Sequence, residues 1–171
     1  MKKIPTIVCL RNPIARFISA FYYRVNREKA QFIREWLSQK SLGDHYDFLN
    51  YLIDTNDFNN PIISWKANQE EPKVVYNKKV EKSYGFEPQS TWLKDTPKVV
   101  FITQELCKEW DFFCNRYELP LHNLPLENSS KIHNKSNKEL SESQIIFLKE
   151  IYLNDFKIYE KYKNINFEDR I

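Results

Sequence analysis

Residues 4–25 constrain the fold most, because they predict a buried strand, a tight turn and an amphipathic helix. Residues 4–10 form a short apolar, β-branched run, which is typical of a strand in a sheet covered on both faces. Asn12 suits a helix N-cap, and Pro13 suits the first helical position, where no N–H is needed. Apolar residues then recur at helical spacing up to Val25, so the helix has one apolar face.

Arg11 directly follows the predicted strand, at the end where open α/β sheets place their ligands. A guanidinium beside a helix N-terminus favours an anion. The chain has only two glycines, Gly43 and Gly85, so we expect no glycine-rich phosphate loop and an anion held by side chains and the helix start. The alternative is a plain strand–turn–helix unit with Arg11 and Arg16 in surface ion pairs.

The pattern Arg-Asn-Pro-x-x-Arg-x-x-Ser-x-Phe over residues 11–21 resembles the 3′-phosphate-binding motif of sulfotransferases that use 3′-phosphoadenosine 5′-phosphosulfate (PAPS), especially their carbohydrate-type branch. The resemblance implies that Arg11 and Ser19 bind the 3′-phosphate of this donor, and that Arg16 is more structural. It also implies an α/β fold, a helix-rich domain around a small parallel sheet, similar to a truncated P-loop-like sulfotransferase fold. The acceptor is expected to be a carbohydrate or another hydroxyl compound.

Residues 84–93 resemble a second family segment, Phe-x-Pro-Gln-x-x-Trp, which lies beside the acceptor site. The resemblance implies that Gln89 and Trp92 bind the acceptor. An amide offers both a donor and an acceptor, and an indole offers a flat face for a sugar ring. The alternative is that Phe86, Trp92 and Leu93 only pin a long loop onto the core.

Residues 121–138 predict a polar loop. Part of it loosely matches a family loop that closes over the donor, which implies donor contacts for Ser129, Ser130 and Lys131. The alternative is a solvated loop. His122 and His133 lie in this loop without neighbours at metal-ligand spacing, so we expect no metal site.

The remaining pattern predicts a second strand and several helices. Residues 98–102 predict the strand, and Thr103 is a plausible cap for the helix after it. Asp44 predicts the cap of another helix, with His45 as a solvated residue in its first turn rather than a catalytic one. Ser141 opens a final helix with a capping box. Asp155 interrupts the apolar stripe of that helix, which predicts a structural salt bridge to an arginine such as Arg16.

Size and composition set wider limits. A chain of 171 residues with 42% hydrophobic residues predicts a single globular domain over residues 1–171. The net charge of +3 is dispersed along the chain, so we expect no nucleic-acid surface. No apolar run reaches the length of a membrane span. Three cysteines that do not form a disulfide framework favour a reduced, cytoplasmic protein.

The resemblance also implies two parts upstream of the 3′-phosphate motif: a Lys-x-Gly-x-[Thr/Ser] loop for the 5′-phosphosulfate and a catalytic base. The motif begins ten residues after Met1, so we expect both parts outside this chain. The chain is then a fragment, a subunit completed by another chain, or a degenerate binder. An exposed sheet edge is also expected, which invites a second copy or a partner chain.

The first functional hypothesis is therefore sulfate transfer from PAPS to a hydroxyl acceptor, provided that the missing elements are supplied. The alternative is a non-enzymatic module that binds a nucleotide or a sulfated ligand on a degenerate sulfotransferase scaffold.

Overall fold

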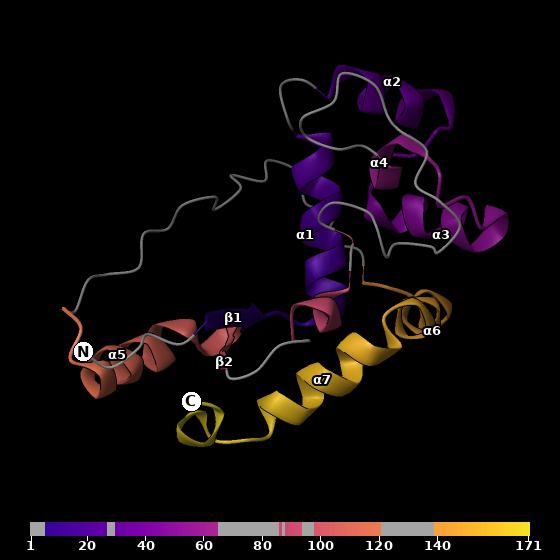
Figure 1. Cartoon of the computed structure of the whole chain (residues 1–171). Coiled ribbons are helices and arrows are strands. Elements are labelled where there is room, and N and C mark those ends of the chain that lie inside the picture. The colour runs from indigo at the N-terminus through magenta and orange to yellow at the C-terminus, as the bar shows by residue number, and fades with distance from the viewer. Residues whose placement is uncertain (1–5, 27–29, 65–85, 87, 94–97, 121–138) are drawn as a thin grey trace. The chain divides into compact units, whose positions relative to one another are not determined.

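The structure is a computed structural model that describes residues 6–26, 30–64, 86, 88–93, 98–120 and 139–171 (Figure 1). These residues divide between two compact units. We call them the sheet unit, which comprises Met1–Asn12, Gln89–Ser129 and Asn154–Ile171, and the helical unit, which comprises Pro13–Pro88 and Ser130–Leu153. The single domain over residues 1–171 stays a prediction.

The sheet unit contains two parallel strands, β1 (Thr6–Leu10) and β2 (Lys98–Ile102). Their register pairs Thr6 with Lys98 and Leu10 with Ile102, so both strands end at the same edge. The sequence prediction of two strands is confirmed. The described part of the chain is rich in helices around this small parallel sheet, so the predicted fold class is also confirmed.

Alternating side chains of the strands pack on opposite faces, as the two-residue period of a strand requires. One face packs against α7 (Leu153–Lys163) through a buried group that comprises Val8, Leu10, Val100, Ile102 and Tyr159. The other face packs Val99 and Phe101 against Phe113 and Cys114 of α5 (Leu106–Tyr117).

The expected covering of both faces is wrong for β1. Ile7 is 42% exposed and Cys9 is also exposed, whereas Val8 and Leu10 are buried. Ile7 and Cys9 pair in register with Val99 and Phe101, which α5 covers. Helix α5 therefore covers this face of the sheet at β2, and among the described residues it leaves the same face exposed at β1.

Three short 3₁₀ helices complete the described sheet unit: η1 (Gln89–Leu93), η2 (Thr103–Glu105) and η3 (Phe167–Arg170). Thr103 does not cap its helix, contrary to the sequence prediction. Its hydroxyl donates instead to the carbonyl of Leu10, the last residue of β1, at 2.9 Å.

The described helical unit contains α1 (Pro13–Val25), α2 (Gln31–Gln39), α3 (His45–Thr55), α4 (Pro61–Ser64) and α6 (Glu142–Ile151). Pro13 begins α1, as predicted. Phe17 of α1 is 2% exposed, and its ring centroid lies 6.3 Å from that of Phe48 and 5.3 Å from that of Phe86. Aromatic packing of this kind makes up much of the unit's core.

Two predicted caps are confirmed. The Asp44 carboxylate accepts hydrogen bonds from the N–H groups of Tyr46 and Asp47, at 2.9 and 3.0 Å. Ser141 and Gln144 form the predicted capping box at the start of α6. The Gln144 amide also donates to the Tyr46 carbonyl at 2.9 Å, which ties α6 to α3.

Two other predictions about helices are wrong. The final helix is divided into α6 and α7 by Tyr152, whose hydroxyl donates to the Phe86 carbonyl at 2.8 Å. His45 is 3% exposed rather than solvated, and its Nδ1 lies 3.1 Å from the Tyr22 hydroxyl. None of the described helices combines the length and the apolar character that crossing a membrane requires.

Candidate functional site

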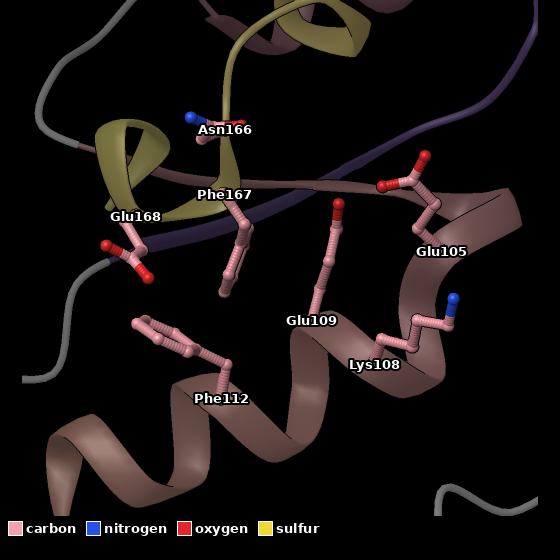
Figure 2. Close-up of a pocket in the computed structure, with 7 residues that line it drawn as sticks. All are labelled: Glu105, Lys108, Glu109, Phe112, Asn166, Phe167 and Glu168. Atoms are coloured by element: carbon pink, nitrogen blue, oxygen red, sulfur yellow. The ribbon is translucent and has the colours of Figure 1, made fainter.

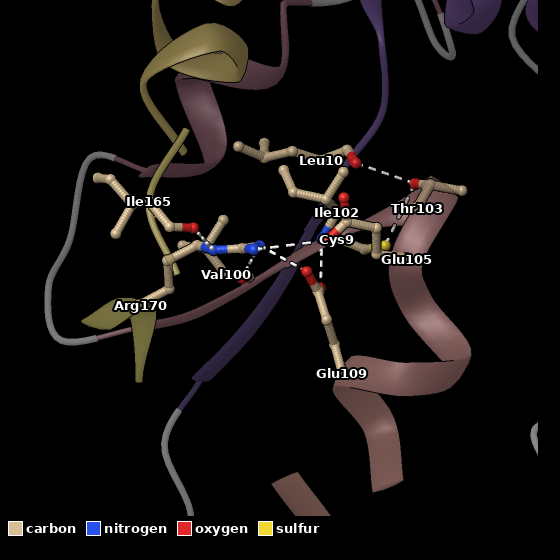
Figure 3. Close-up of polar contacts among 9 residues, drawn as sticks. All are labelled: Cys9, Leu10, Val100, Ile102, Thr103, Glu105, Glu109, Ile165 and Arg170. Atoms are coloured by element: carbon tan, nitrogen blue, oxygen red, sulfur yellow. Dashed lines mark hydrogen bonds and ion pairs between the residues drawn. The ribbon is translucent and has the colours of Figure 1, made fainter. Parts of the chain in front are cut away.

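The carboxyl edge of the sheet brings polar groups from both strands together. Arg11 follows β1 and Thr103 follows β2 at neighbouring positions, because Leu10 pairs with Ile102. The Thr103 hydroxyl donates to the Leu10 carbonyl and lies 3.4 Å from the Cys9 sulfur (Figure 3). Thr103, the residue that follows β2, therefore holds the end of β1 through this hydrogen bond.

Arg11 itself is held by its backbone. Its N–H donates to Oε1 of Gln89 at 2.8 Å, and its carbonyl accepts from Nε2 of the same amide at 2.8 Å. The residue is half-buried, and among the described residues no hydrogen bond or ion pair engages its guanidinium. A fixed backbone with an unengaged cationic side chain suits the binding of an anion.

Gln89 is 2% exposed and is held in turn by Asp155. Its backbone N–H and that of Ser90 donate to the two Asp155 oxygens, at 2.7 and 2.8 Å. Asp155 is 1% exposed, and the two N–H groups in the first turn of η1 stabilise its buried charge. The predicted pairing of Asp155 with an arginine is wrong, because its partners are these backbone N–H groups; its structural role agrees with the prediction.

These contacts also bear on the acceptor segment. Each end of the Gln89 amide bonds to Arg11, which leaves one N–H and one lone pair for other partners. Direct contact of Gln89 with an acceptor stays a prediction. Phe86 is fully buried against Phe17, and Leu93 packs on the sheet core, as the loop-pinning alternative predicts for these two residues.

The other predicted site residues are only partly described. Ser19 lies on α1, in the helical unit, and is half-buried, whereas Arg11 belongs to the sheet unit. Trp92 lies in η1, and its side chain is outside the described part of the structure. The predicted donor loop also lies outside the described residues, with Ser129, Ser130 and Lys131.

A second polar group in the sheet unit was not predicted from the sequence. Glu109 on α5 is 4% exposed, and its Oε2 accepts from the Ile102 N–H at 2.7 Å. Its Oε1 lies 2.8 Å from Nη1 of Arg170, near the end of the chain (Figure 3). The available signal was the position of Glu109, one helical turn before the buried Phe113.

Arg170 connects this ion pair to the rest of the unit. Its Nε donates to the Ile165 carbonyl at 3.0 Å, and its Nη1 donates to the Val100 carbonyl at 3.4 Å. Burial raises the pKa of Glu109, while the Ile102 N–H and the Arg170 charge oppose the rise. Both Glu109 oxygens therefore have structural partners, and we assign the pair to stability.

Glu109 also lines a pocket of about 360 Å³ (Figure 2). Its walls come from η2, α5 and the C-terminal segment, with Glu105, Lys108, Glu109, Phe112, Asn166, Phe167 and Glu168. Glu105 and Glu168 outnumber the single lysine even with Glu109 paired to Arg170, so the pocket disfavours a polyanionic ligand. Nowhere in the described residues do three or more His, Cys, Asp or Glu side chains gather in a way that would hold a metal ion.

Comparison with known proteins gives one positive result. The model of a family described as the sulfotransferase family matches residues 1–163. Neither the curated proteins nor the solved structures give a match.

Proposed function

Because this chain belongs to the sulfotransferase family, we propose that it binds the 3′-phosphate of PAPS and serves the transfer of sulfate to a hydroxyl group. Arg11 and Ser19 are the proposed phosphate-binding residues, and a carbohydrate is the proposed acceptor. The observation that carries the proposal is the position of Arg11. Its backbone is fixed at the carboxyl edge of a parallel sheet, and no described group engages its guanidinium.

The chemistry of Arg11 fits a phosphate. A guanidinium presents parallel N–H donors that match two phosphate oxygens, and its charge persists at any physiological pH. Ser19 adds one hydroxyl donor, eight residues further along the chain. Ser129, Ser130 and Lys131 are proposed to add two hydroxyls and an ammonium on the donor side, and Gln89 and Trp92 are proposed for the acceptor side.

When bound, PAPS supplies a sulfuryl group, which forms a bond with the acceptor oxygen as its bond to the 5′-phosphate oxygen breaks. Adenosine 3′,5′-bisphosphate leaves with the electron pair of that bond, and the acceptor proton passes to a base. Catalysis of such a transfer rests mainly on positioning and charge stabilisation. The proposed contribution of Arg11 and Ser19 is to anchor the 3′-phosphate.

Calorimetric titration with adenosine 3′,5′-bisphosphate tests the proposal. Loss of a charge-assisted contact costs about 1.5–3 kcal/mol, so Arg11→Ala should weaken binding by about 10- to 150-fold. Ser19→Ala should weaken it by a smaller factor. Arg116→Ala is the matched control, because Arg116 is exposed near the end of α5 and should leave the affinity unchanged. Equal affinities of the wild type and Arg11→Ala would remove Arg11 from the site.

Transfer of labelled sulfate from PAPS to a panel of carbohydrate acceptors then separates two functions. Transfer of the label to an acceptor supports an enzyme. Nucleotide binding without transfer under the same conditions supports the alternative, a binding module on a sulfotransferase scaffold.

We also propose that a second copy or a partner chain associates at the exposed sheet edge, where β1 pairs only with β2 among the described strands. This proposal is supported by Ile7, which is 42% exposed, and by Cys9, which is exposed beside it on the same face. Sedimentation at micromolar concentration should show a dimer that Ile7→Lys dissociates. A wild-type monomer under these conditions would contradict association of a second copy.

A further inference from the structure

The end of β1 is held by side chains from two directions. Thr103 donates to the Leu10 carbonyl at 2.9 Å, and the Gln89 amide bonds to both the N–H and the carbonyl of Arg11 at 2.8 Å. Two bonds to one residue act like a rung of a sheet, and they fix the direction in which its side chain leaves the backbone. The base of the Arg11 side chain is therefore fixed, while its guanidinium has no partner among the described residues.

Gln89 does not hold this position alone. Both oxygens of the buried Asp155 carboxylate accept backbone N–H groups of η1, from Gln89 at 2.7 Å and from Ser90 at 2.8 Å. Hydrogen bonds to an ionised acceptor are the stronger kind. The carboxylate therefore fixes the backbone from which the Gln89 amide reaches Arg11.

Burial makes this connection costly to break. Asp155 is 1% exposed and Gln89 is 2% exposed, so water cannot readily replace either set of bonds. A relay therefore runs from Asp155 on α7 through Gln89 on η1 to Arg11 after β1. All three residues belong to the sheet unit.

We infer that Asp155 and Gln89 are positioning residues, which hold Arg11 in the orientation that binds the 3′-phosphate of the donor nucleotide. The inference rests on the proposed function. It adds a role through Arg11 to the proposed acceptor contact of Gln89, and it gives the buried Asp155 a role beyond capping η1. A bidentate guanidinium contact depends on direction, so an unsupported Arg11 backbone weakens the contact without removing the charge.

Calorimetry with two nucleotides tests the relay. The affinity for adenosine 3′,5′-bisphosphate divided by that for adenosine 5′-monophosphate reports the 3′-phosphate contact. A chain that is merely less stable keeps this ratio. We compare the wild type with Gln89→Met, which keeps the side-chain volume, and with Asp155→Asn, which removes the charge. Gln144→Met is the matched control, because Gln144 is also a fully buried amide bonded to backbone but lies in the helical unit.

The ratio should fall by about tenfold in Gln89→Met and in Asp155→Asn, and it should stay unchanged in Gln144→Met. In an Arg11→Ala background, Gln89→Met should lower the ratio no further, because the relay acts through Arg11. If circular dichroism shows that Asp155→Asn does not fold, Gln89→Met and the double variant Arg11→Ala with Gln89→Met test the relay without it.

Two results overturn the relay while the proposed function stands. One is a ratio that Gln89→Met leaves intact although Arg11→Ala lowers it. The other is an affinity ratio that Gln89→Met lowers by the same factor in the Arg11→Ala background as in the wild type. A wild-type chain with no preference for the 3′-phosphate overturns the proposed function and the relay together.

Discussion

Replacing Arg170 with methionine removes the positive partner of a buried carboxylate and keeps an unbranched, though shorter, side chain. In the wild type, Arg170 Nη1 lies 2.8 Å from Glu109 Oε1, and the Arg170 side chain is only 2% exposed. The variant leaves Glu109, itself 4% exposed, with the hydrogen bond from the Ile102 N–H at 2.7 Å but without its ion-pair partner. An uncompensated charge is then buried between α5 and the sheet.

The burial of this ion pair sets the expected change in the free energy of unfolding. Removal of one partner of a buried ion pair destabilises a protein by about 3–5 kcal/mol. For a chain of this length, such a loss should lower the melting temperature by roughly 6–20 °C. The double variant Glu109→Gln with Arg170→Met buries no charge, so it should recover the part of the loss that comes from the buried charge, whereas the Ile165 and Val100 carbonyls still lack their Arg170 donors.

The loss should also depend on pH. Burial raises the pKa of Glu109 above its ordinary value of 4.5, and the Ile102 N–H and Arg170 oppose that rise. Arg170→Met removes the opposition from Arg170, so the pKa of the folded variant rises further. A carboxyl with a raised folded pKa contributes stability that is present below its unfolded pKa and is lost as pH rises through the folded value. The deficit should therefore be small in acid and grow toward neutral pH.

Thermal and urea unfolding followed by circular dichroism measures these differences. Lys108→Met is the control. Lys108 is an exposed cation on α5, the helix that carries Glu109, so its replacement should change the free energy of unfolding by less than about 0.5 kcal/mol. A deficit for Arg170→Met below about 1 kcal/mol, or one that shrinks toward neutral pH, would refute the reasoning.

Two further substitutions test the helical unit. Asp44→Ala should destabilise the chain by about 0.5–2 kcal/mol in urea unfolding, because it removes the cap of α3, whereas Asp44→Ser keeps a capping oxygen and should cost much less; equal losses would contradict the capping role. Gln144→Met should cost about 1–3 kcal/mol, because it leaves the Tyr46 carbonyl and the Asn50 side chain without the donor they share; an unchanged unfolding midpoint would show that α6 does not depend on this tether.

Local signals in the sequence predicted local structure. The apolar run ending at Leu10, the proline that opens α1 and the cap at Asp44 each act within a few residues, so the pattern alone was enough. The exposure of Ile7 was not predictable, because it depends on how much of the sheet α5 covers. The break between α6 and α7 accompanies a bond from Tyr152 to a carbonyl sixty-six residues away.

In the site, too, the sequence predicted the local features and not the contacts between distant residues. The sequence identified Arg11 as the residue at the strand end, and the structure places it there with its backbone held. The contacts of Asp155 with Gln89 and Ser90, and the pair of Glu109 with Arg170, join residues sixty or more positions apart. No periodicity or spacing encodes such contacts, and a carboxylate whose backbone N–H partners lie far away along the chain has no signature in residue types.

The most direct test of the central claim compares two ligands that differ only in the 3′-phosphate, on the wild type and on Arg11→Ala. The wild type should bind adenosine 3′,5′-bisphosphate more tightly than adenosine 5′-monophosphate, and Arg11→Ala should lose most of that preference while its affinity for the monophosphate stays nearly the same. A preference of the same size in both proteins would contradict the account, since the 3′-phosphate would then be bound without Arg11.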